Sequence, residues 1–245
     1  MFKSGSVNPT RQQIDNYGPL KFDFHIMPWC IAIPLPRIDS RENWLSGDGL
    51  TSMSFLNWPI EQQDFNRKSW RHRKYVATDL LKHFQRAFPS VTYNLLWSSP
   101  TINAQAWISG VAKNVTIYGG LARHPGLTRS GLALAIAHET GHHLGGCPLD
   151  PEIRWMTWQG QADYWAARTG IPRVFGSRAF NMTLRGARQV LELHRYLSTL
   201  MDGDEPDLSD ECRYHIFLAG ASNAEIPSCA KIEFRKCFNR DYPET

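Results

Sequence analysis

LTRSGLALAIAHETGHHL, residues 127–144, is the stretch of sequence that decides how this chain folds. Positions 132–137 are all leucine, isoleucine or alanine, so a helix formed here is apolar on every side and runs through the core. Thr128 or Ser130 can cap its first turn, because a side-chain oxygen accepts a hydrogen bond from an exposed backbone N–H. Gly145-Gly146 predicts its end, since glycine readily takes the left-handed conformation there.

The same helix carries an H-E-x-x-H motif formed by His138, Glu139 and His142. Residues four apart on a helix lie ~400° round the axis and ~6 Å along it, so both imidazoles can bind one Zn²⁺. Glu139 lies ~100° away, where its carboxylate can take a proton from a metal-bound water as general base. The alternative is a core helix with hydrogen-bonded histidines, but unpaired buried charge is costly and favours the metal. One Zn²⁺ per chain is therefore predicted.

The third protein ligand of this predicted site lies downstream, and the sequence leaves its identity open. A catalytic zinc site has three protein ligands and a water. The metzincin pattern requires a ligand at position 148, where Pro148 stands, and is rejected. An aspzincin-like pattern uses Asp163, and a gluzincin pattern uses the position of Gln159.

The remaining pattern predicts an α+β fold in which a small, mostly antiparallel sheet packs on the H-E-x-x-H helix and further helices follow. Short β-branched and aromatic segments separated by turn residues predict the strands, and apolar residues at helical spacing predict the helices. Gly119-Gly120 closes the sheet, and the acidic stretch 202–210 is read as an exposed linker. The expected strands are 91–97, 103–109 and 114–118, and the other expected helices are 65–88, 158–169 and 183–201.

Three regions are expected along the chain. Residues 1–60 are rich in Pro, Gly, Ser and Asn and predict an irregular extension, residues 61–205 form the core, and residues 206–245 form a cysteine-containing segment packed on it. Cys212, Cys229 and Cys237 cluster in that last segment, which suggests one disulfide in an oxidising compartment. Free thiols in a reducing cytosol are the alternative.

Composition limits the classes of function. The 245 residues include 42% hydrophobic and 20% charged residues, as in an ordinary globular protein. No apolar run approaches the ~18 residues of a membrane span. The basic run 67–74 is read as a solvated helix face, so no nucleic-acid partner is expected. The polar amino-terminal residues carry no secretory signal, which predicts a cytoplasmic protein or leaderless export, while the clustered cysteines also allow secretion. The sequence does not indicate an oligomeric state.

Five segments together resemble soluble bacterial relatives of the CAAX prenyl protease and HtpX-type gluzincins, which are zinc metallopeptidases. They occur in the family's order over about residues 90–220. They are NAQAW at 103–107, YGGLARHPGLT at 118–128, HETGHHLGG at 138–146, QGQADYWA at 159–166 and CRYHIFLAG at 212–220. The resemblance implies a zincin-like, minigluzincin core and hydrolysis of a peptide or protein substrate.

Carried over position by position, the resemblance implies a role for each site residue. His138 and His142 ligate zinc and Glu139 is the base. Gln159 occupies the third-ligand position, and Asp163 holds the first histidine. The segment Asn103, Ala104, Gln105, Ala106 and Trp107 implies an edge strand that binds substrate backbone by strand addition.

The chain departs from the family at Gln159, where the family has glutamate. A glutamine oxygen can reach zinc but brings no charge, so either the metal binds more weakly or Asp163 becomes the third ligand. A peptidase is expected, and a catalytically weak or inactive peptide-binding protein is the alternative. The sequence does not choose among the candidates for stabilising the oxyanion, which are Tyr164, His194, Tyr214 and His215.

Overall fold

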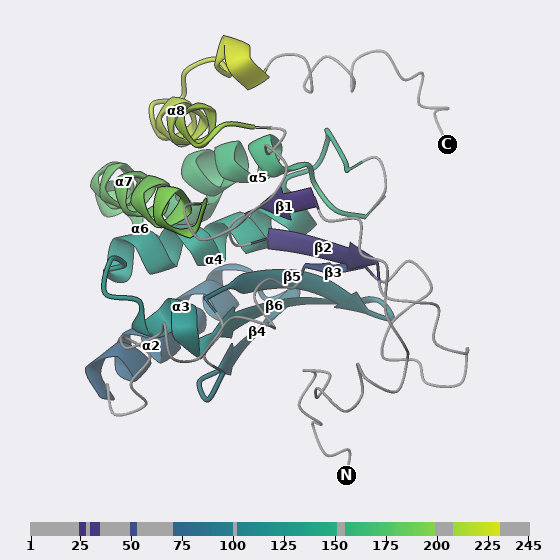
Figure 1. Ribbon diagram of the computed structural model, residues 1–245, viewed down its shortest axis with the longest axis vertical. Helices are drawn as coiled ribbons and strands as arrows, with labels where there is room; N and C mark the ends of the chain where they lie inside the picture. Colours follow the sequence, from purple (N-terminus) through teal and green to yellow (C-terminus); the bar gives the residue numbers. More distant parts are fainter. Residues whose placement is uncertain are drawn as a thin grey trace.

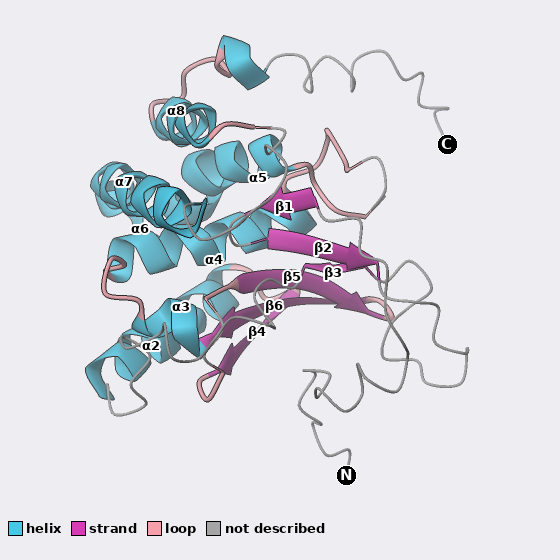
Figure 2. Ribbon diagram, in the orientation of Figure 1, coloured by secondary structure: helices cyan, strands magenta, loops and turns pink. Residues whose placement is uncertain are grey.

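The computed structural model describes residues 71–99, 102–150, 155–198 and 208–230, and the backbone of three short strands within residues 25–52. Its architecture is α+β, which confirms the predicted class. A three-stranded sheet lies on one side of the long helix α4 (Arg129–Leu144), and helices α5, α7 and α8 lie on the other (Figure 1; Figure 2). Within the described residues, no helix is both long and apolar enough to cross a membrane.

The sheet consists of β4 (Val91–Leu96), β5 (Ala104–Ser109) and β6 (Ala112–Tyr118), in the order β4-β6-β5. β5 and β6 form an antiparallel hairpin, with Gly110 in its turn at a φ of 59°. β4, however, runs parallel to β6, so the expectation of a mostly antiparallel sheet was wrong for this pair. The chain passes from β4 to the far edge before β6 returns between them, and this path makes β4 and β6 run in the same direction.

The two faces of the β5–β6 hairpin differ in chemistry. Ala104 pairs with Ile117 and both belong to the apolar core that also contains α4. The alternate positions are polar, where Gln105 pairs with Thr116 and Trp107 Nε1 donates to Thr116 Oγ1 at 3.0 Å. Period-2 alternation therefore turns the apolar face toward the helix and leaves the polar face on the other side.

Helix α4 lies at the centre of the fold, as its sequence predicted. Its positions 130–143 are all buried. The side chain of Thr128 accepts a hydrogen bond from Ser130 N at 3.3 Å, which confirms one of the two expected caps. α2 (Arg71–Ala87) packs against β4 and α4. Its observed range lies within the predicted helix, and the predicted residues 65–70 lie outside the described chain.

The other helices refine the expected boundaries. The expected helix 158–169 begins as α5 and continues through a π-helical turn into a further short helix. β6 ends at Tyr118, so Gly119 and Gly120 follow the sheet as expected, and they also begin the short helix α3. The bounds are α3 (Gly119–Arg123), α5 (Gln159–Trp165), a π-helix (Ala166–Gly170), α6 (Ile171–Phe175), 3₁₀ turns (Gly176–Arg178 and Ser228–Ala230) and α7 (Ala179–Ser198).

Helix α8 (Asp210–Ala221) was not predicted. Its start follows from local chemistry, since the Ser209 side chain accepts from Cys212 N at 3.2 Å. Asp210 and Glu211 occupy its first turn, where negative charge favours the helix dipole. The interpretation of residues 202–210 as one acidic linker therefore missed the N-cap Ser209 and the start of α8 at Asp210.

Two glycines let α5 lie close to helices on both sides. A Cβ at Gly141 of α4 would come within 2.8 Å of the Ala162 carbonyl oxygen. A Cβ at Gly220 of α8 would come within 2.6 Å of the Tyr164 carbonyl oxygen. Because neither position has room for a side chain, α5 packs tightly between α4 and α8.

Three short strands lie within the region for which no regular structure was expected. β1 (His25–Met27), β2 (Cys30–Pro34) and β3 (Leu50–Ser52) form an antiparallel sheet in that order. β3 also contacts β5, so this second sheet lies beside the first.

A disulfide joins Cys212 of α8 to Cys229, 17 residues later. This confirms the bridge expected in the carboxyl-terminal segment, and it joins the start of α8 to the 3₁₀ turn (Ser228–Ala230). Cys147 is disulfide-bonded as well. The expected participant Cys237 lies outside the described residues.

We expect the double substitution Cys212→Ser and Cys229→Ser to lower the free energy of unfolding by about 3 kcal/mol, the value for a loop of this length. The melting temperature should fall by roughly 6–12 °C, measured by circular dichroism under oxidising conditions. Adding a reductant should lower the melting temperature of the wild type more than that of the double variant. An unchanged melting temperature in the variant would contradict a stabilising bridge.

Candidate metal centre

His138, Glu139 and His142 of α4 bring together three ligand-type side chains in the interior. All three are fully buried, and one ligand atom of each lies within 4.8 Å of the others. The two imidazole centroids are 4.5 Å apart with their planes at 81°. The helical spacing of the motif therefore gives the convergent group that the sequence predicted, of a size that could hold one metal ion.

In both imidazole rings Nδ1 is hydrogen-bonded to a protein oxygen. His138 Nδ1 lies 2.6 Å from Asp163 Oδ1, and His142 Nδ1 lies 2.7 Å from the Thr157 carbonyl oxygen. A carbonyl or an ionised carboxylate only accepts, so Nδ1 carries the hydrogen in each ring. Any metal bound here would be held through Nε2 of both rings.

Burial also sets the charge state of His138. Removal from water lowers its pKa to about 3, although the neighbouring Asp163 carboxylate acts in the opposite direction. The ring is therefore neutral at neutral pH. A neutral imidazole is the form that binds a metal.

Asp163 of α5 is held by a residue that the sequence analysis missed. Arg213 of α8 donates from Nε to Oδ2 at 2.7 Å and from Nη2 to Oδ1 at 2.8 Å. Burial alone would raise the pKa of the Asp163 carboxyl, but Arg213 and His138 outweigh it and lower that pKa to about 2. The carboxylate is thus ionised, and both of its oxygens are occupied by protein partners.

Gln159 is the first residue of α5, one helical turn before Asp163. Its side chain is only 6% exposed, and its Oε1 atom is buried without a hydrogen-bond partner among the described residues. An unsatisfied buried carbonyl costs about 1–3 kcal/mol, so this oxygen needs an explanation.

The predicted substrate segment occupies an edge of its sheet. β5 pairs only with β6 in the sheet β4-β6-β5, and Asn103 directly precedes it. Both polar atoms of the buried Asn103 amide have no hydrogen-bond partner among the described residues. Ala104 and Ala106 are buried and Trp107 is tied to Thr116, and β3 of the second sheet also contacts this strand.

Tyr118 is a second buried residue that sequence reasoning did not single out. Its hydroxyl donates to Gln105 Oε1 at 2.5 Å. Burial raises the pKa of Tyr118, and the negative charge of Glu139 raises it further, which places the phenol within electrostatic range of the motif carboxylate. Its position at the end of β6, directly before a helix, is the only sequence signal that could have marked it.

Of the four oxyanion candidates, His194 lies within electrostatic range of Asp163, which holds the motif residue His138. His194 is hydrogen-bonded to Asp210 at 3.0 Å. Tyr164 hydroxyl donates to the Ala224 carbonyl, and Tyr214 and His215 lie ring to ring, with centroids 5.7 Å apart.

The third histidine of the helix is engaged apart from the cluster. His143 Nε2 lies 2.9 Å from the Asn114 carbonyl oxygen, and its ring stacks on Trp155 with centroids 5.1 Å apart. It is buried to nearly the same degree as the motif histidines. Its described partners thus lie outside the group formed by His138, Glu139 and His142.

Comparison with known protein families, curated proteins and solved structures found no significant match to this chain.

Proposed function

We propose that this protein is a zinc metallopeptidase with a zincin-like, gluzincin-type core. The observation that carries the proposal is the buried convergence of His138, Glu139 and His142, with Nδ1 of both rings tied to a protein acceptor. Carboxylate–histidine and carbonyl–histidine hydrogen bonds of this kind orient the ligands of catalytic zinc sites. The family resemblance of the five sequence segments supports the same reading.

The donor set fits zinc. Zn²⁺ favours imidazole nitrogen with a hard oxygen as an additional ligand, and its catalytic sites keep one position open for water. His138 and His142 would provide the nitrogens. The buried, unsatisfied Oε1 of Gln159 is the oxygen that such an ion would satisfy. When bound, zinc would lower the pKa of a coordinated water and polarise the scissile carbonyl.

Gln159 is a better third ligand than Asp163. Both Asp163 oxygens are already bound by His138 and Arg213, so metal binding would have to break a buried ion pair. The Oε1 atom of Gln159 has no such partner among the residues that the structure describes. We therefore assign Gln159 to the third ligand position and Asp163 to the support of His138.

Glu139 would act as the base. It is adjacent to His138 on the helix and fully buried, which strengthens its electrostatic interactions with groups in the site. Its carboxylate would accept a proton from the attacking water and then deliver it to the departing amine nitrogen. The resemblance of residues 103–107 supports peptide binding beside β5, a strand that β3 of the second sheet also contacts.

Metal analysis and a cleavage assay on the purified wild-type chain test the proposal. We expect about one zinc per chain, and cleavage of an internally quenched peptide that stops in a chelator and returns when zinc is restored. A chain that binds no zinc would overturn the metal site. Zinc binding with no cleavage over a broad peptide library would overturn the peptidase.

The second candidate function is a peptide-binding protein of the same fold with little or no catalysis. The specific observation in its favour is the neutral glutamine at the third-ligand position. A site with three neutral ligands offsets none of the ion's charge. Peptide binding without cleavage would support this candidate.

The Gln159→Glu variant should bind zinc more tightly than the wild type by about tenfold or more, because a carboxylate brings a negative charge to the cation. Competition with a chromophoric chelator measures this affinity. Gln161→Glu is the matched control, since Gln161 lies two residues further along α5 and donates to the Gly145 carbonyl. Equal affinities of Gln159→Glu and the wild type would remove Gln159 from the ligand set.

A further inference from the structure

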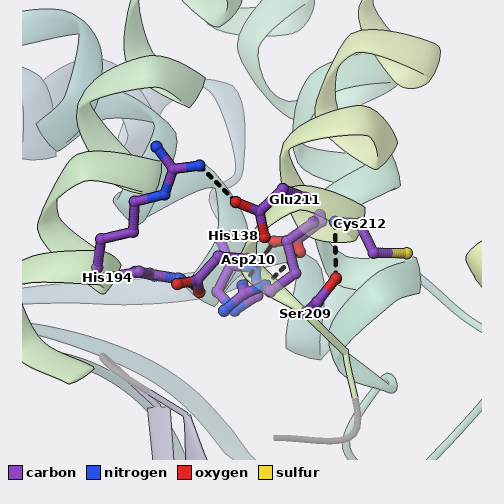
Figure 3. A network of polar contacts seen from close by, with 9 residues as sticks. His138, His194, Ser209, Asp210, Glu211 and Cys212 are labelled. Carbon is purple, nitrogen blue, oxygen red and sulfur yellow. Dashed lines mark hydrogen bonds and ion pairs between the residues drawn. The ribbon is translucent and has the colours of Figure 1, made fainter. Parts of the chain in front are cut away.

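Three buried side chains from three helices form a continuous chain of charge and hydrogen bonds. His138 of α4, Asp163 of α5 and Arg213 of α8 are 0%, 0% and 2% exposed. Figure 3 shows His138 in a network of polar contacts that also includes the α8 residues Asp210 and Cys212. The third member of this chain lies outside the predicted core of residues 61–205, and the sequence analysis assigned it no role.

We propose that Arg213 is a positioning residue for the metal centre, holding the Asp163 carboxylate so that its Oδ1 fixes the His138 ring. This inference rests on the proposed function and deepens it. By this proposal α8 contributes a residue that positions the metal ligands, although Arg213 itself would bind neither the metal nor the substrate.

The geometry of the ion pair supports this role. Two nitrogens of one planar guanidinium bind two oxygens of one carboxylate, at 2.7 and 2.8 Å, so the carboxylate cannot turn about its own axis. One of those oxygens, Oδ1, is the atom that faces His138 Nδ1 at 2.6 Å. Fixing the plane of the carboxylate thus fixes the direction of the imidazole, and with it the direction of Nε2.

A single lysine nitrogen could balance the charge but not the orientation. An ammonium is a point charge without a planar fork, so it leaves the carboxylate plane unspecified. Charge neutralisation and orientation can therefore be separated by substitution. A purely structural ion pair would need only the charge and the packing.

The surroundings hold Arg213 in place. It is the fourth residue of α8, whose start is capped by Ser209 and whose preceding residue, Cys212, is bound to Cys229. At the other end of the helix, Gly220 brings α8 close to the Tyr164 carbonyl of α5. The arginine is thus carried on a helix whose start is capped and cross-linked and whose other end packs closely on the helix that bears Asp163.

The test compares zinc affinities of Arg213→Lys and Arg213→Met with the wild type by chelator competition, on protein shown to be folded by circular dichroism. We expect about tenfold weaker zinc binding for Arg213→Lys and up to about a hundredfold for Arg213→Met, the range for supporting groups of metal ligands. The visible absorption of the Co²⁺-loaded protein should also change, because it reports the arrangement of ligands.

Arg195→Met is the matched control. Arg195 of α7 likewise pairs with a carboxylate on a neighbouring helix, Glu211 of α8, but this pair is exposed and lies outside the His138 chain. It should leave zinc affinity and the Co²⁺ spectrum unchanged. In the Asp163→Asn background, Arg213→Lys should add little further loss, because the arginine acts through that carboxylate.

The outcomes separate this inference from the proposed function. If the wild type binds zinc and Arg213→Lys folds with unchanged affinity and spectrum, the positioning role is overturned while the metal site stands. Full additivity of Asp163→Asn and Arg213→Lys would also overturn it. If the wild type binds no zinc, both proposals fall together.

Discussion

The Glu139→Gln variant should retain its zinc and lose peptide cleavage by about 10²–10⁴-fold, the usual contribution of a general base. Glutamine keeps the shape of the side chain but cannot accept a proton from water at neutral pH. Because His138 and His142 keep their own hydrogen bonds to Asp163 and Thr157, the ligand set should be undisturbed. Metal analysis and a quenched-peptide assay on the same preparation measure both quantities.

Glu211→Gln is the control for Glu139→Gln, since Glu211 is an exposed glutamate on α8. It should leave cleavage unchanged. Cleavage by Glu139→Gln within a few-fold of the wild type would exclude Glu139 as the base. It would point instead to another proton acceptor or to a contaminating peptidase.

The His142→Ala variant should lose zinc and cleavage together while the chain stays folded. One of the two proposed imidazole ligands disappears, and the Thr157 carbonyl loses its donor, which costs about 1–3 kcal/mol of stability. Zinc should fall from about one per chain to near zero after dialysis. The melting temperature, followed by circular dichroism, distinguishes loss of metal from loss of fold.

His143→Ala is the matched control for His142→Ala. His143 is the next residue of the same helix, is also buried, and also bonds a backbone carbonyl, that of Asn114. Its loss should lower stability by a similar amount and leave zinc in place. If His143→Ala released zinc and His142→Ala did not, the ligand assignment would be wrong.

Local signals in the sequence were enough to predict the central helix and the clustering of its motif. The cap at Thr128, the apolar positions and the four-residue spacing of the histidines all act within one helix, so no distant contact is needed. The parallel pairing of β4 with β6 was not predictable in the same way. Alternation buries the same face whether two strands run parallel or antiparallel, and only the path between them decides.

The support of His138 could be predicted only in part. Asp163 was expected beside the histidine from the family pattern, whereas Arg213 lies 50 residues further along the chain. The sequence around Arg213 does contain one indication of this role. This residue stands at helical spacing from the buried Ile216, Phe217 and Gly220, and an arginine on a buried face requires a buried anion.

The ion pair between α5 and α8 has a consequence for how the chain is made. When the chain has been synthesised up to residue 205, it contains the H-E-x-x-H helix and Asp163. It does not yet contain Arg213, whose guanidinium neutralises the Asp163 carboxylate. The nascent interior then holds an anion with no counter-charge, a state that water must keep solvated. We therefore expect tight closure of α5 onto α4 only after Arg213 has been synthesised, and we expect a fragment that ends at residue 205 to lack this closure.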